Sequence, residues 1–246
     1  MTTAVSKLST IVVGRAFEDR SLSLLQSRLS MTLTRVGGPG DGGVDLQGWW
    51  WIPRQAAKHD TNDQRRGIRV IASCKALKSK LGPVHLRELE GAALVQQHSL
   101  VETSTTGIHT SELVAVMISL SGFTPASIKK AMASPIPFLL MHLPPHEPLP
   151  IPSTKQDEEA TQTHSAPTSS ESSSSSDSIG SMIWNPKLGG TNGLLGGCME
   201  VRWALSQRQR QDEAGRPVLY WKGKKLEHWV PETQDGEIGK RFLGTC

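Results

Sequence analysis

Two charged residues on neighbouring strand-like segments, Asp45 and Lys75, have the types and spacing needed for phosphodiester chemistry. Asp45 follows a glycine-rich turn at 37–43, and Lys75 ends a second strand-like segment. Side chains alternate faces along a strand, so Asp45 shares a face with Gln47, and Lys75 shares one with Ser73. If the two segments pair as a hairpin, the carboxylate and the ammonium meet at its end. There a carboxylate can hold a divalent cation, and a lysine can orient the attacking water.

Alternating helices and strands around this hairpin indicate an α/β fold with three layers. Apolar residues at helical spacing predict a helix over 10–29, and Pro83 at a first-turn position begins another that runs to about 98. Thr124 and Pro125 start a short helix that ends near 133. Further strands are predicted over 31–36, 112–120 and 136–143.

The residues around the hairpin resemble a known nuclease family. The pattern of residues 40–46, Gly-Asp-Gly-Gly-Val-Asp-Leu, followed by Cys74-Lys75, resembles the Mrr-like branch of the restriction-endonuclease-like (PD-(D/E)xK) nucleases. Segments at 14–18, 84–91 and 121–124 extend the resemblance over about residues 10–143. The segment 40–50 and the tail motifs at 184–186 and 201–203 look more specifically like the fungal mitochondrial "required for respiratory growth protein 7" family.

The resemblance implies a restriction-endonuclease-like core with a central mixed β-sheet flanked by helices. Short strand-like segments at 198–205 and 218–226 predict a β-rich C-terminal extension. The resemblance also implies DNA cleavage that depends on Mg²⁺ or Mn²⁺. Asp45 would be the principal metal ligand, Glu18 on the first helix would support the metal, and Lys75 would position the water. The backbone carbonyl of Cys74 would be a further ligand, and Ser73 a weak one.

Three more residues are candidates for nucleic-acid contact. Lys78 and Lys80 gather positive charge just after Lys75, where they would touch the phosphate backbone. Gln47 lies two residues beyond Asp45 on the same face of the predicted strand. The alternative for Glu18 is an ordinary solvated glutamate on a helix, and its metal role depends on the resemblance alone.

Ser73 departs from the family pattern, which has Glu or Gln at this position. A serine hydroxyl is a poor ligand for a hard cation beside a carboxylate. The alternative function is therefore a nuclease fold that no longer cuts and acts as a mitochondrial nucleic-acid-binding or scaffold protein. A purely structural α/β protein is a third possibility, and salt-dependent binding to nucleic acid would distinguish it.

Composition divides the 246 residues into three regions. Only 37% of the chain is hydrophobic, which indicates that part of it is not packed. Residues 151–180 hold five acids and one lysine, a charge of −4 within a total of +4, so the remainder carries +8. A basic folded part fits an anionic partner, with ordinary solubility charge as the alternative. We predict domains at 1–143 and 182–246, joined by a disordered Pro/Ser-rich acidic linker at 144–181.

The sequence says less about where the protein is located in the cell and about its oligomeric state. Three cysteines without paired spacing argue against a disulfide framework and against a structural zinc site. No apolar run approaches the roughly 20 residues that a membrane span needs. The first 17 residues contain two basic and no acidic residues, which is compatible with a mitochondrial presequence. A mitochondrial location and a possible homodimer follow from the resemblance.

Three adjacent tryptophans, Trp49, Trp50 and Trp51, are unusual in a chain so poor in aromatic residues. Adjacent strand residues point to opposite faces, so the three cannot all enter one core. We expect two of them in the core and one at an edge. The alternative is a tryptophan near the surface that stacks on a base or packs against the C-terminal tail.

Overall fold

Seven consecutive buried residues identify the centre of the fold, strand β4 (Leu113–Ser119). The computed structural model describes residues 10–36, 42–54, 65–102, 112–145, 179–204 and 216–231. A strand covered on both faces is apolar throughout, and parallel strands are usually of this kind. β4 pairs in parallel with β3 on one side and β5 on the other. The other pairings of the six-stranded sheet, ordered β1-β2-β3-β4-β5-β6, are antiparallel.

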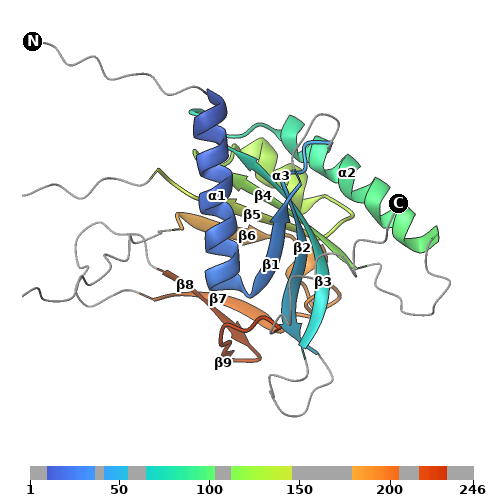
Figure 1. Cartoon of the computed structure of the whole chain (residues 1–246). Helices are drawn as coiled ribbons and strands as arrows, with labels where there is room; N and C mark the ends of the chain where they lie inside the picture. Colours follow the sequence, from blue (N-terminus) through green and yellow to red (C-terminus); the bar gives the residue numbers. More distant parts are fainter. Residues whose placement is uncertain are drawn as a thin grey trace, which may run out of the picture.

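The helices and strands follow one another along the chain in a mixed α/β order (Figure 1). Their bounds are α1 Thr10–Leu29, β1 Met31–Arg35, β2 Leu46–Pro53, β3 Arg65–Lys75, α2 Pro83–Glu102, β4 Leu113–Ser119, α3 Pro125–Met132, β5 Phe138–His142, β6 Ser181–Trp184, α4 Pro186–Gly189, β7 Met199–Ala204, β8 Arg216–Trp221 and β9 Lys224–Lys225. Thr124 caps α3 by accepting a hydrogen bond from the Ser127 amide, as predicted.

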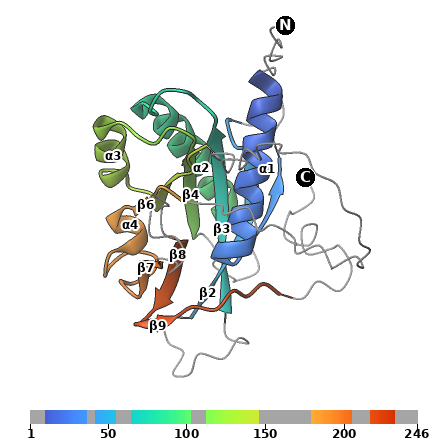
Figure 2. The same cartoon turned by 90° about the vertical axis from the view of Figure 1, so that its left-hand side faces the viewer.

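The main sheet separates two buried clusters of apolar side chains. Helix α1 packs on one face against β1, β2 and β3, and α2 and α3 pack on the other face against β3, β4 and β5. Figure 2 shows α1 and α3 on opposite sides of the sheet. The predicted mixed sheet between helical layers is therefore confirmed. Since α2 and α3 cover mainly β3 to β5, that face of β1 and β2 is not under a described helix.

The chain after residue 178 returns to the main sheet. β6 pairs with β5, so the boundary predicted between residues 181 and 182 falls inside a strand of the six-stranded sheet. A small antiparallel sheet, β7-β8-β9, follows. Its apolar residues Met199, Leu219 and Trp221 join the same buried cluster as the apolar face of α1. Nearly all of the predicted linker lies outside the described residues.

A buried asparagine, Asn185, fastens β6 to the core. Its side-chain amide donates hydrogen bonds to the carbonyls of Ala131 at 3.0 Å and Ile136 at 2.8 Å. Its side-chain oxygen accepts from the amides of Phe138 and Leu188, each at 3.0 Å. The same oxygen caps α4, because Asn185 is the residue that precedes Pro186. All four polar groups would lose a partner if this side chain were removed.

Replacing Asn185 by alanine should destabilise the protein by about 3 kcal/mol, because buried polar groups would be left without partners and a helix cap would be lost. The measurement is the free energy of unfolding from urea titration. Asn192→Ala, at an exposed asparagine in the turn that follows α4, is the matched control and should change it by less than about 0.5 kcal/mol. Equal effects of the two substitutions would contradict the role assigned to Asn185.

Candidate functional site

The site forms where the pairing of β2 with β3 ends. The last pair is Leu46 with Ala72, and beyond it the Asp45 amide still donates to the Ala72 carbonyl at 2.8 Å. The next donor on β3, the Cys74 amide, has the Asp45 side chain as its partner, with 2.6 Å between N and Oδ2. A hydrogen bond from a backbone amide to a carboxylate is a strong one. The Asp45 carboxylate is therefore held in one orientation at the end of the sheet.

The structure brings Asp45, Ser73 and Lys75 together, as the hairpin prediction required. Antiparallel register places Asp45 opposite Ser73, and Lys75 follows on the same face. The Ser73 hydroxyl donates to Asp45 Oδ2 at 3.3 Å. Lys75 Nζ lies 3.9 Å from the same oxygen, so the ion pair is loose. A lysine ammonium has three donors, and a loose pair leaves capacity for an anionic ligand.

Helix α1 carries Glu18 to the same end of the sheet. Its Oε2 lies 3.0 Å from Nε of Arg35, at the end of β1. Burial raises the pKa of Glu18, and the negative charge of Asp45 raises it further, while the Arg35 charge opposes both. The two carboxylates therefore lie close enough to repel each other. Like-charged acids in a partly buried position are typical of functional sites, although structural networks also contain them.

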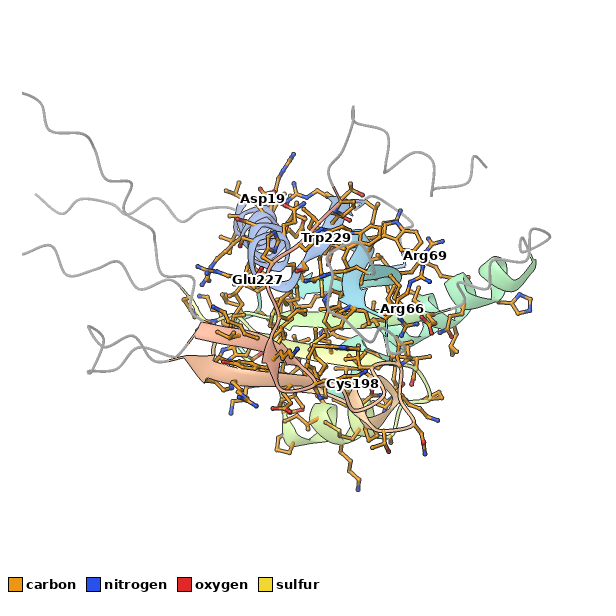
Figure 3. The ribbon with its side chains drawn as sticks, turned by 90° about the horizontal axis from the view of Figure 1, so that it is seen from below. Asp19, Arg66, Arg69, Cys198, Glu227 and Trp229 are labelled. Carbon is orange, nitrogen blue, oxygen red and sulfur yellow. The ribbon has the colours of Figure 1, made fainter. Side chains whose placement is uncertain are left out.

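Arg35 is a member of the site that the sequence did not reveal. Its Nη2 donates to Asp19 Oδ1 at 2.7 Å, while its Nε faces Glu18, so one guanidinium holds two consecutive acids of α1. Asp19 is labelled in Figure 3. Arg35 precedes the glycine-rich turn in the sequence, and nothing in the local pattern indicates which helix residues it meets. Only the pairing of β1 with β2 and the packing of α1 on β1 bring these groups together.

The Cys74 side chain points away from Ser73 and Lys75. It belongs to the buried cluster under α1. Burial and then the charge of Asp45 raise the pKa of the thiol above its ordinary value. The thiol therefore stays protonated, and a protonated thiol is neither a nucleophile nor a metal ligand. The metal role predicted for the Cys74 backbone carbonyl stays a prediction.

The three predicted nucleic-acid contacts lie on or next to these strands. Gln47 is half-buried on β2, two residues from Asp45, opposite Ile71. Lys78 and Lys80 are exposed in the connection from β3 to α2. Their exposure suits phosphate contact, and their role stays a prediction.

The carboxylates of Asp45 and Glu18 fit Mg²⁺ or Mn²⁺ as a partial ligand set. Among the described residues, no three His, Cys, Asp or Glu side chains cluster closely enough to hold a metal ion. Mg²⁺ in phosphoryl-transfer sites commonly takes only one or two carboxylates, and waters and substrate phosphates supply the other ligands. Within the same residues, no hydrogen bond to Asp45 Oδ1 is found, and the Asp45–Glu18 repulsion is of the kind that a cation would relieve.

One expectation for the tryptophans was wrong. Trp50 is fully buried, whereas Trp49 and Trp51 are both half-buried on the opposite face. One tryptophan therefore lies in the core and two lie outside it, because Trp50, the middle residue of the three, faces α1. The alternative of packing on the tail is confirmed, since Trp51 meets Trp229 edge to face with 5.9 Å between ring centroids.

Replacing Glu18 by glutamine should change how stability depends on pH. A carboxyl group whose pKa is raised by folding binds a proton more tightly in the folded state, so wild-type stability falls as pH rises from the unfolded value through the raised one. Glutamine removes that loss. The free energy of unfolding of Glu18→Gln, relative to wild type, should therefore rise over this interval in urea titrations. Parallel curves for the two proteins would contradict the raised pKa.

Comparison with known proteins identifies the family of the chain. The family model described as "Required for respiratory growth protein 7" matches residues 9–64 and 53–170, a region that contains Glu18, Asp45 and Lys75. An uncharacterised mitochondrial protein of Schizosaccharomyces pombe is 33% identical over 138 residues, which are 56% of this chain and 47% of that protein. The chain thus spans about half the length of this relative.

The relative is named as mitochondrial, so the mitochondrial location predicted for this chain is confirmed. No helix in the described part of the chain has the length and apolar character needed to cross a bilayer. No solved structure matches the chain. The family match covers well over half of the sequence, and the chain belongs to the required for respiratory growth protein 7 family.

Proposed function

We propose that this mitochondrial protein is a divalent-metal-dependent nuclease with a restriction-endonuclease-like core, which cleaves DNA in support of respiratory growth. The observation that carries the proposal is the meeting of Asp45, Lys75 and Glu18. They come from three separate elements, β2 with its preceding turn, β3 and α1, and they gather at one end of a mixed sheet between helical layers. This is the arrangement that the resemblance to Mrr-like nucleases implies.

Each residue has a role that its surroundings support. Asp45 and Glu18 would hold Mg²⁺ or Mn²⁺, which would supply charge stabilisation and a more acidic water for phosphodiester hydrolysis. Asp45 is pre-oriented, because the Cys74 amide and the Ser73 hydroxyl both donate to its Oδ2. Lys75 is loosely paired, so its ammonium can bind a phosphate oxygen and orient the attacking water.

Ser73 favours a second candidate, a nuclease fold that binds nucleic acid without cutting it. Its side chain is buried, only 2% exposed, and its hydroxyl proton is directed at Asp45. A glutamate or glutamine here would bring a further oxygen ligand into the site, which serine does poorly. Weak metal binding with retained affinity for nucleic acid would characterise this candidate.

Purified protein should nick supercoiled plasmid DNA in the presence of Mg²⁺ or Mn²⁺. Asp45→Asn keeps an oxygen acceptor for the Cys74 amide but removes the charge, and Lys75→Met keeps the length of the side chain but removes the ammonium. Each should lower the cleavage rate at least about 100-fold, as loss of a transition-state charge contact does. Lys224→Met, at an exposed lysine of β9, is the matched control and should cleave like the wild type.

Other results would decide between the two candidates. Cleavage that survives both Asp45→Asn and Lys75→Met would show that this is not the active site. If no protein cleaves but all bind DNA in a salt-sensitive way, the non-cutting binder is correct. The same titrations with RNA and a determination of the molecular mass in solution test the predicted preference for DNA and the predicted homodimer.

A further inference from the structure

The face of β1 and β2 opposite α1 carries a continuous row of aromatic and guanidinium groups. Strand alternation places Trp49 and Trp51 on the face opposite Trp50. On β3, Arg69 pairs with Trp49, and Gly67 pairs with Trp51. Helices α2 and α3 lie on the same side of the sheet but pack further along it, on β3 to β5. Both outer tryptophans stay half-buried on this face.

The tryptophan row consists of Arg69, Trp49, Trp51, Trp229 and Arg65, in that spatial order. The guanidinium carbon of Arg69 lies 5.9 Å from the Trp49 ring centroid. The Trp49 and Trp51 centroids are 6.3 Å apart with the planes tilted by 32°, and Trp229 follows at 5.9 Å from Trp51. Arg65 closes the row at 5.7 Å from Trp229. Arg69 and Trp229 are labelled in Figure 3.

Gly67 leaves room for the indole rings of Trp49 and Trp51 to pack closely against β3. A Cβ atom at this position would stand 3.0 Å from Cε3 of Trp49 and 3.0 Å from Cζ3 of Trp51, closer than nearly all Cβ contacts. A side chain at this position would require both rings to shift by a few tenths of an ångström. The glycine therefore lets both indole rings pack close over β3 at a strand position where a β-branched residue is otherwise favoured.

The rings are held in place at their edges. Trp51 Nε1 donates to Thr32 Oγ1 at 2.8 Å, so its polar atom has a partner within the protein. The Trp229 amide donates to Ser30 Oγ at 3.0 Å, and Arg65 donates to the Glu227 carbonyl at 2.9 Å. These bonds tie the C-terminal segment to β3 and to the residue that precedes β1. A pre-ordered ring loses little entropy when a ligand stacks on it.

The tryptophan row runs on from the candidate site. Gln47, Trp49 and Trp51 occupy alternate positions and so share one face of β2, and Asp45 directly precedes this strand. At the rise of a β-strand, Asp45 and Trp49 are about 13 Å apart along the strand. A strand of a few nucleotides spans that length. A polynucleotide whose phosphate lies at Lys75 can therefore extend along β2 toward the indoles.

We propose that the tryptophan row binds single-stranded nucleic acid, with bases stacked on the tryptophans and phosphates near Arg65 and Arg69. Aromatic platforms beside cationic groups bind single strands without sequence preference, because every base has a flat face. The two arginines give the charge that a phosphate backbone complements. Binding of the single-stranded nucleic acid does not depend on its cleavage. Only the position of the bound nucleic acid relative to Asp45 rests on the proposed nuclease function.

The test is the fluorescence anisotropy of a labelled oligothymidylate, titrated with the full chain in EDTA so that no cleavage contributes. Trp49→Leu and Trp51→Leu should each weaken binding about 5- to 100-fold. Trp49→Phe keeps an aromatic face and should restore most of the affinity. Trp203→Leu is the matched control, because Trp203 is 41% exposed on the small sheet outside the row, and it should bind like the wild type.

Several outcomes would overturn the inference. These are absence of oligothymidylate binding by the wild type, equal weakening by Trp49→Leu and Trp203→Leu, or equal weakening by Trp49→Leu and Trp49→Phe in folded proteins. Failure of the nuclease proposal gives a different result. In that case the wild type does not cut plasmid, yet its oligothymidylate binding still depends on Trp49 and Trp51. Asp45→Asn should lose cleavage and keep strand binding.

Discussion

The antiparallel register of β2 and β3 is the constraint on which the rest of the structure depends. With Leu46 opposite Ala72, Asp45 faces Ser73 and Lys75, while Leu46 and Ala72 enter the core beneath α1. A slip of one residue would reverse every side chain of β2, which would take Trp50 out of the core and would also end the approach of Asp45 to Ser73. The burial of Trp50 and Ile52 therefore fixes the site as well as the core.

The fold was largely readable from the sequence, because its signals are local. The buried run of β4, the Thr124 cap and the spacing of apolar residues on α1 each indicate an element without knowledge of the others. The Asp45–Lys75 meeting was also predictable, since a hairpin needs only alternation and a turn. Arg35 and Asn185 could not be found this way, because their partners lie on elements whose placement no local pattern specifies. The tryptophan faces were misjudged because alternation fixes which residues share a face but not which face is buried.

The candidate site and the stability of the fold oppose one another at Glu18. A partly buried carboxyl group with a raised pKa, next to another carboxylate, costs free energy whenever it is ionised. Arg35 offsets part of that cost and leaves the rest. Residues retained at a cost to stability are expected where they serve binding or catalysis, and this strengthens the case for Glu18 over an ordinary helix glutamate.

In the proposed nuclease, Ser73 would link metal binding to substrate binding. With two carboxylates rather than three acidic or amide ligands, the proposed site would attract a cation less strongly, and waters or a substrate phosphate would have to complete its coordination. Metal and nucleic acid would then favour each other's binding. Affinity for the nucleic acid must come from contacts away from the reacting phosphate, since such contacts can supply the binding energy that the reacting centre uses. The tryptophan row begins on β2, the strand that directly follows Asp45, and has the chemistry to provide those contacts, so the loss of one ligand at the centre is compatible with a working site.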